Sequence, residues 1–166
     1  MCKETDTSRH IVISIANQQL QLFEGECCLK RYSVSTAKNG AGEMAGSGCI
    51  PRGLHVIRAM IGDGLAENSV FVGRRATGEI YSPELAQKNP QRDWVLTRIM
   101  WLSGLEKGKN RMDRVDTMRR YIYIHGCPDE LPMGVPLSHG CIRMRNRDIV
   151  ELFSLLQGKV RVLICE

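Results

Sequence analysis

Two short motifs in the second half of the chain pair a histidine with a cysteine two positions later. They occupy residues 125–127 and 139–141, both read His-Gly-Cys, and eleven residues separate them. A thiolate is a strong nucleophile, but a free thiol has a pKa of about 8.5 and needs a nearby base or positive charge to react. The pattern therefore favours cysteine chemistry assisted by a histidine.

In the first interpretation Cys141 is the nucleophile and His125 is the base that activates it. Such a base lies near its cysteine in space rather than in sequence, so the loop between the motifs must bring them together. Gly140 comes just before the cysteine and leaves backbone N–H groups unshielded, which suits an oxyanion hole. This arrangement would support acyl transfer.

Two other interpretations use the same motifs. A structural zinc site would take its four ligands from both of them, namely His125, Cys127, His139 and Cys141. Paired zinc ligands are usually separated by two to four residues, whereas here only one residue lies between them. Alternatively, the cysteines are small apolar residues in a buried cluster. The residues alone leave all three interpretations open.

The first motif follows a strand, and the second is followed by a helix. Residues 121–124 (Tyr-Ile-Tyr-Ile) have the strongest β-propensity in the chain. Asn146 is expected to cap a helix whose apolar residues recur at helical spacing. These residues are Ile149, Leu152, Phe153 and Leu156, and Gly158 stands where such a helix would end.

The rest of the chain predicts a mainly β protein. Apolar runs of strand length occupy residues 10–15, 19–23, 29–34, 54–61, 70–72, 94–101 and 160–164. A length of 166 residues favours one domain over residues 1–166. We expect residues 1–9 to be disordered. We also expect residues 82–116 to form a lid, because a long polar stretch in a compact domain is usually functional.

Composition excludes several classes of protein. No apolar run is long enough to span a bilayer, and the 5% of aromatic residues are not interleaved with basic ones as in nucleic-acid stacking surfaces. The chain carries sixteen arginines against seven lysines and a net charge of +5. Arginine suits carboxylates and phosphates, so an anionic ligand is expected, with a solvated basic surface as the alternative.

Cysteine usage indicates a reducing compartment. Seven cysteines, two of them adjacent, make a poor disulfide framework. The first ten residues lack the apolar stretch of a signal peptide, so we expect a cytoplasmic location. A natural N-terminus upstream of Met1 would instead allow a periplasmic or cell-envelope location, and Cys2 would then be a possible lipid acceptor.

Residues 124–144 resemble the active-site motif of the YkuD-type L,D-transpeptidase family. That motif is a histidine–glycine pair, a loop, and then Ser/Thr-His-Gly-Cys, which residues 125–126 and 138–141 match. The N-terminal strands, the glycine-rich loop and residues 51–53 resemble the start of the family domain. Two positions depart from the pattern, because Cys127 and Ile50 stand where threonine is usual.

The resemblance implies a mixed β-sandwich with one C-terminal α-helix, and acyl transfer through a thioester. Cys141 would attack the carbonyl that joins the third residue of a peptidoglycan stem peptide to its terminal D-alanine. His125 would take the thiol proton and later protonate the leaving amine. The backbone carbonyl of Gly126 would orient His125.

The remaining implied roles lie beside the nucleophile. The N–H groups of His139, Gly140 and Cys141 would stabilise the oxyanion. Ser138 would shape the loop and contact the substrate. Arg143 would hold either the loop or a substrate carboxylate, or else form a structural ion pair. No cofactor or metal is implied.

Three functions remain open from the sequence. The arginine excess and the absence of a leader favour an L,D-carboxypeptidase that trims tetrapeptide to tripeptide stems during muropeptide recycling. An L,D-transpeptidase that forms cross-links or exchanges D-amino acids would use the same residues. A non-catalytic module that binds peptidoglycan peptides is the alternative of another class. The oligomeric state is left open.

Overall fold

The structure, a computed structural model, describes residues 8–166. The elements are, in chain order, β1 (Arg9–Ser14), β2 (Gln19–Glu24), β3 (Cys27–Ser33), β4 (Gly53–Ile61), β5 (Ser69–Val72), β6 (Arg75–Ile80), α1 (Pro83–Lys88), β7 (Val95–Gly104), the 3-10 helix η1 (Asp113–Val115), β8 (Tyr123–Gly126), β9 (Ile142–Met144), α2 (Asn146–Leu155) and β10 (Arg161–Cys165). Most of the disorder expected over residues 1–9 concerns positions outside the described residues, and Arg9 already begins β1.

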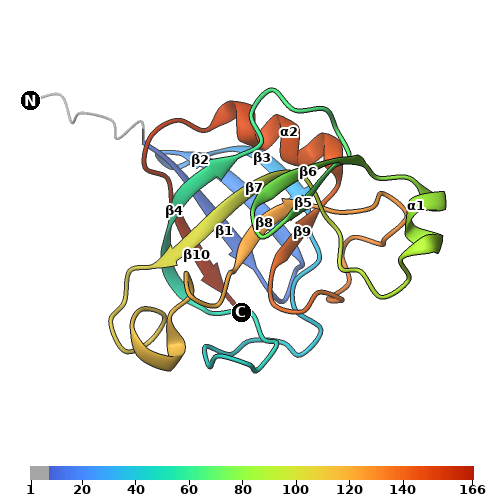
Figure 1. The fold of residues 1–166 in the computed structure, drawn as a ribbon. Coiled ribbons are helices and arrows are strands. Elements are labelled where there is room, and N and C mark those ends of the chain that lie inside the picture. The colour runs from blue at the N-terminus through green and yellow to red at the C-terminus, as the bar shows by residue number, and fades with distance from the viewer. Residues whose placement is uncertain (1–7) are drawn as a thin grey trace, which may run out of the picture.

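The ten strands belong to one hydrogen-bonded sheet of mixed direction (Figure 1). The order along the sheet is β3-β2-β1-β10-β4-β7-β5-β6, and β8 joins β7 to β9. The pairs β1–β10 and β8–β9 are parallel, whereas the other pairs are antiparallel. The prediction of a mainly β protein is therefore confirmed.

The sheet encloses its main core between its two halves. Apolar side chains of β1, β2 and β10 meet those of β7, β8 and β9 in one buried cluster, and α2 adds Ile149 and Leu152. Period-2 alternation along each strand supplies these inward side chains. Burial of the two helix residues agrees with the predicted apolar face of the C-terminal helix.

The start of α2 differs from the expected cap. Arg145 occupies the N-cap position, and Asn146 is the first helical residue, only 1% exposed. Its side chain turns inward, where it bonds to Thr97 Oγ1 and donates to the backbone oxygen of Cys127 at 3.0 Å. The cap prediction was wrong because local sequence does not show that a buried network competes for this amide.

The segment 82–116 does not form a single lid. Its middle is β7, an almost fully buried strand that pairs with β4, β5 and β8. The polar parts on either side lie at opposite ends of the molecule, with α1 at one end and η1 at the other (Figure 1). Helix α1 was not predicted, although Ser82 Oγ accepts from the N–H of Leu85 as a regular cap. Among residues 8–166 no helix is long and apolar enough to cross a membrane.

Candidate active site

Parallel pairing of β8 with β9 brings side chains of the two motifs onto one face of the sheet. Ile124 pairs with Ile142 and His125 with Arg143. Since side chains alternate along a strand, both isoleucines point into the main core, and His125 and Arg143 point to the other face. Cys141, two positions before Arg143, shares that face. The register therefore brings the histidine of the first motif and the cysteine of the second onto the same surface.

The thiol of Cys141 lies among backbone groups. Its Sγ accepts from the N–H of Tyr123 at 3.3 Å and donates to the backbone oxygen of Tyr121 at 3.4 Å. Burial raises the pKa of Cys141 to about 11, and the nearby Asp93 carboxylate acts in the same direction. The resting cysteine is therefore a neutral thiol that needs a base to become a nucleophile.

His125 has the environment of such a base. It is 2% exposed, and its Nδ1 lies 2.7 Å from the backbone oxygen of Gly126. A carbonyl oxygen only accepts, so Nδ1 carries the proton and Nε2 keeps its lone pair. Burial also lowers the pKa of His125, which keeps the imidazole neutral.

His125 and Cys141 share a cavity of about 190 Å³. Within residues 8–166 no hydrogen bond joins the two side chains, because the thiol is directed to Tyr121.

Gly126 allows the backbone of β8 to pass close to β7. A Cβ there would lie 2.6 Å from the backbone oxygen of Leu96 and 2.6 Å from Asn146 Oδ1. The facing residue Thr97 has φ of +72°, which is rare for a β-branched residue, and it lies at an irregularity of the β7–β8 pairing. Close packing around the glycine thus positions the carbonyl that holds His125.

The loop before the nucleophile is held by Ser138. Its hydroxyl donates to the backbone oxygen of Cys141 at 2.5 Å and accepts from the N–H of Gly140 at 3.2 Å. The N–H groups of His139 and Cys141 have no partner within residues 8–166. The oxyanion role of all three N–H groups stays a prediction, and the geometry leaves those of His139 and Cys141 available.

Sequence reasoning missed Asp93. Its carboxylate lies 3.0 Å from Arg143 Nη2 and 3.4 Å from His139 Nδ1. Arg143 is 8% exposed and also donates to the backbone oxygen of Leu137 at 3.3 Å. These contacts agree with two of the roles expected of Arg143, which are holding the loop and forming a structural ion pair. No local pattern marks Asp93, because only the fold carries it to the second motif.

Arg120 and the tyrosine pair 121 and 123 were also missed. Arg120 donates to the backbone oxygens of Glu43 at 2.9 Å and Cys49 at 2.6 Å, so it ties the glycine-rich loop to the wall of the cavity. The two tyrosines contact the thiol through their backbone atoms. Such contacts cannot be predicted from the type of the residue.

Cys127, the cysteine of the first motif, does not line this cavity. Cys127 is fully buried, its Sγ donates to the backbone oxygen of Met144 at 3.4 Å, and burial raises its pKa to about 12. Cys141, in contrast, lines the cavity. Within residues 8–166 no group of three or more histidine, cysteine or acidic side chains is arranged to hold a metal ion.

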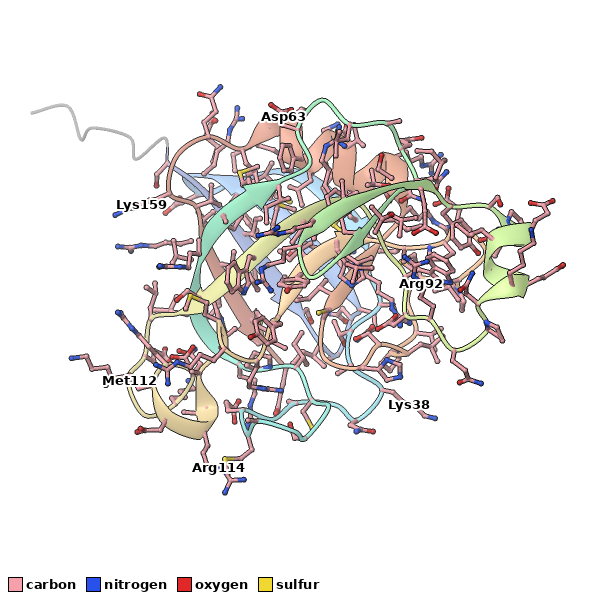
Figure 2. All side chains as sticks on the ribbon, viewed as in Figure 1. Lys38, Asp63, Arg92, Met112, Arg114 and Lys159 are labelled. Carbon is pink, nitrogen blue, oxygen red and sulfur yellow. The ribbon has the colours of Figure 1, made fainter. Side chains whose placement is uncertain are left out.

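A larger cavity of about 600 Å³ adjoins the first and shares Asp93, His139 and Arg143 with it. Its outer wall comes from the α1 segment, where Figure 2 shows Arg92 near the helix. Opposite lie Pro128 to Leu131 of the loop between the motifs. Of the segment expected to form a lid, residues between 83 and 94 line this cavity, and their role as a lid stays a prediction.

Comparison with known proteins gives a consistent result. Residues 8–164 match the family described as YkuD, L,D-transpeptidase catalytic domain. The YkuD protein of Bacillus subtilis (strain 168) is 39% identical over 46 residues, which is 28% of this chain and 28% of that protein.

Solved structures share the fold at low sequence identity. An L,D-transpeptidase (residues 123–326) from Xylanimonas cellulosilytica has a TM-score of 0.54 and 16% identity over 98% of this chain and 62% of that one. Bd1075 of Bdellovibrio bacteriovorus has a TM-score of 0.60 and 17% identity over 98% of this chain and 49% of that one. L,D-transpeptidase 3 of Mycobacterium tuberculosis, in complex with a faropenem-derived adduct, has a TM-score of 0.58 and 14% identity over 96% of this chain and 60% of that one. The expected fold is confirmed, and this chain spans about half to three-fifths of those chains.

Proposed function

Because the chain belongs to the family of L,D-transpeptidase catalytic domains, we propose that it breaks the bond between the third residue and the terminal D-alanine of peptidoglycan stem peptides. Cys141 would form a thioester with the third residue, and water would then release a tripeptide. The observation that carries this proposal is the shared cavity of Cys141 and His125, with His125 Nδ1 held by Gly126.

The acylation step follows from the protonation states of the two groups. The pKa of Cys141 is raised to about 11 and that of His125 is lowered, so the pair starts neutral. As sulfur attacks the carbonyl carbon, the thiol proton moves to His125 Nε2. The N–H groups of His139 and Cys141 would bind the oxyanion. The C–N bond then breaks, and His125 returns its proton to the amine of D-alanine.

Deacylation reuses the same histidine. His125 Nε2 would take a proton from water, whose oxygen attacks the thioester carbon, and Cys141 leaves and recovers a proton. The 190 Å³ cavity around the thiol has room for this water, since each water needs only about 30 Å³. The adjoining 600 Å³ cavity is large enough for the preceding part of the stem peptide.

The test is mass spectrometry of a muramyl-tetrapeptide incubated with the protein, with and without added D-methionine. We expect tripeptide and free D-alanine in both incubations. Cys141→Ala should abolish the reaction. Cys127→Ala is the matched control, because this cysteine has the same His-Gly-Cys context but is directed away from the cavity, and it should retain activity.

Other outcomes would lead to different conclusions. A D-methionine exchange product or a cross-linked dimer would identify a transpeptidase and overturn the proposed hydrolysis. Faropenem adds an independent check on the nucleophile, since it forms an adduct in the mycobacterial relative. Absence of both product and adduct would instead support a binding module.

A further inference from the structure

The turn between β5 and β6 places an arginine against the face that carries Cys141. Val72 pairs with Arg75, so Gly73 and Arg74 alone form the turn, with φ of +54° and +65°. Positive φ at both positions is typical of the two-residue hairpin turn that matches strand twist, and small residues are usual there. A long side chain in this conformation is uncommon and points to a function for Arg74.

Aromatic side chains surround the Arg74 guanidinium. Its Cζ lies 4.4 Å from the ring centre of Trp101 and 5.1 Å from that of Tyr121. Its Nη1 donates to the Tyr123 hydroxyl at 3.0 Å. In Figure 1 the β5–β6 hairpin is drawn in front of β8, and this hydrogen bond establishes the contact. The aromatic rings cover the faces of the guanidinium and fix its position.

The edge of this guanidinium retains unused donors. Arginine has five N–H groups, and within residues 8–166 only the bond to Tyr123 is made by Arg74, with no carboxylate near it. The other arginines at the site differ: Arg143 is paired with Asp93, Arg92 with Glu79, and Arg120 donates to backbone oxygens. Among these four arginines of the described residues, Arg74 and Arg120 have no carboxylate partner, and Arg74 makes the fewest hydrogen bonds, because Arg120 is held by several backbone oxygens.

Tyr123 links this cation to the nucleophile. Its N–H donates to Cys141 Sγ, and its hydroxyl accepts from Arg74. Tyr123 therefore spans from the sulfur to the guanidinium, with one hydrogen bond at each end. In a stem peptide the terminal carboxylate lies three bonds beyond the carbonyl that the sulfur attacks, about 3–4 Å away.

We propose that Arg74 binds the terminal carboxylate of the peptide attacked by Cys141, and so selects substrates with a free carboxyl end. This inference rests on the proposed function. A planar guanidinium that is stacked on aromatic rings and has free N–H groups along its edge is suited to bidentate carboxylate binding. It also gives the peptide a direction, with D-alanine toward the β5–β6 turn and the preceding residues toward the 600 Å³ cavity.

The test compares a tetrapeptide that ends in D-alanine with the same peptide ending in D-alaninamide. Binding is measured by calorimetry in Cys141→Ala, so the result does not depend on turnover. We expect the acid to bind roughly 10- to 100-fold more tightly than the amide, as for a hydrogen bond between charged groups. Adding Arg74→Gln should remove this preference, and Arg74→Lys should retain part of it.

Arg75→Gln is the matched control. Arg75 is the next residue of the same hairpin and is exposed, so this change should leave the preference for the acid intact. Equal weakening of acid and amide binding by Arg74→Gln would show a role in hairpin packing and overturn the proposal, as would no effect. Turnover of the wild type separates the two hypotheses. D-Alanine release without acid preference would overturn only this inference, whereas acid preference without release would overturn only the proposed reaction.

Discussion

Two buried histidines in this protein have similar environments on one side of the ring and different ones on the other. His55 Nδ1 lies 2.9 Å from the backbone oxygen of Gly53, just as His125 Nδ1 lies 2.7 Å from that of Gly126. The second nitrogen of His55 faces Thr117 Oγ1 at 3.0 Å. The second nitrogen of His125 belongs to a side chain that lines a cavity with a thiol.

This difference separates a histidine that is held on both sides of its ring from one that lines a cavity. Burial lowers the pKa of both imidazoles, so both are neutral near pH 7 and each keeps one lone pair. In His55 the second nitrogen contacts the hydroxyl of Thr117, which also contacts the backbone oxygen of Asn110, so this side of the ring is occupied within the fold. In His125 it remains available for a proton from Cys141. A backbone carbonyl at Nδ1 therefore orients the ring in both histidines, and the group that faces Nε2 determines whether the ring can accept a proton.

The largest expected effect comes from removing each imidazole in turn. His125→Ala should lower kcat/KM for D-alanine release by about 100- to 10,000-fold, because the general base is lost. His55→Gln should keep turnover within about threefold and lower the free energy of unfolding by about 1–3 kcal/mol, because buried hydrogen bonds are lost. Steady-state kinetics and denaturant unfolding measure the two quantities. A comparable loss of turnover in both variants would end the distinction.

The two glycines whose carbonyls hold these histidines give the next comparison. Gly126→Ala should lower both turnover and stability, since its Cβ would lie 2.6 Å from backbone oxygen of β7. Gly53→Ala should lower stability alone, by about 1 kcal/mol or more, because its φ is +97°. We would measure kcat and melting temperature for both. Unchanged kcat in Gly126→Ala would show that its carbonyl has no part in orienting His125.

The last comparison concerns the pH dependence of stability that is due to His55. Burial lowers its pKa from 6.5 to about 4. Between these values the unfolded chain binds more protons than the folded one, so the free energy of unfolding falls as pH is lowered. The contribution of His55 to this fall is at most about 3 kcal/mol. Urea unfolding at pH 7 and pH 4.5 should show a smaller fall for His55→Gln than for wild type. Equal falls would contradict the burial argument.

Local patterns in the sequence predicted much of the fold. Alternating apolar residues identified most strands, and helical spacing identified the buried face of α2. They failed where a residue's role depends on distant partners. Asn146 has the residue type of a cap, but its amide is used by Thr97 and Cys127. Helix α1 lacks any buried residue, so no apolar periodicity marks it.

The candidate site divides in the same way. The sequence by itself predicted cysteine chemistry, because the order Ser-His-Gly-Cys after a His-Gly pair resembles the motif of the family. Only the tertiary structure decided which cysteine lines the cavity. The parallel register of β8 and β9 places Cys141 beside His125, whereas the thiol of Cys127 donates to the backbone oxygen of Met144. It also brought Asp93 and Arg74 to this face from segments that share no local pattern with the motifs. Side-chain type is a local property, whereas strand register and loop approach depend on pairings between residues far apart in the chain.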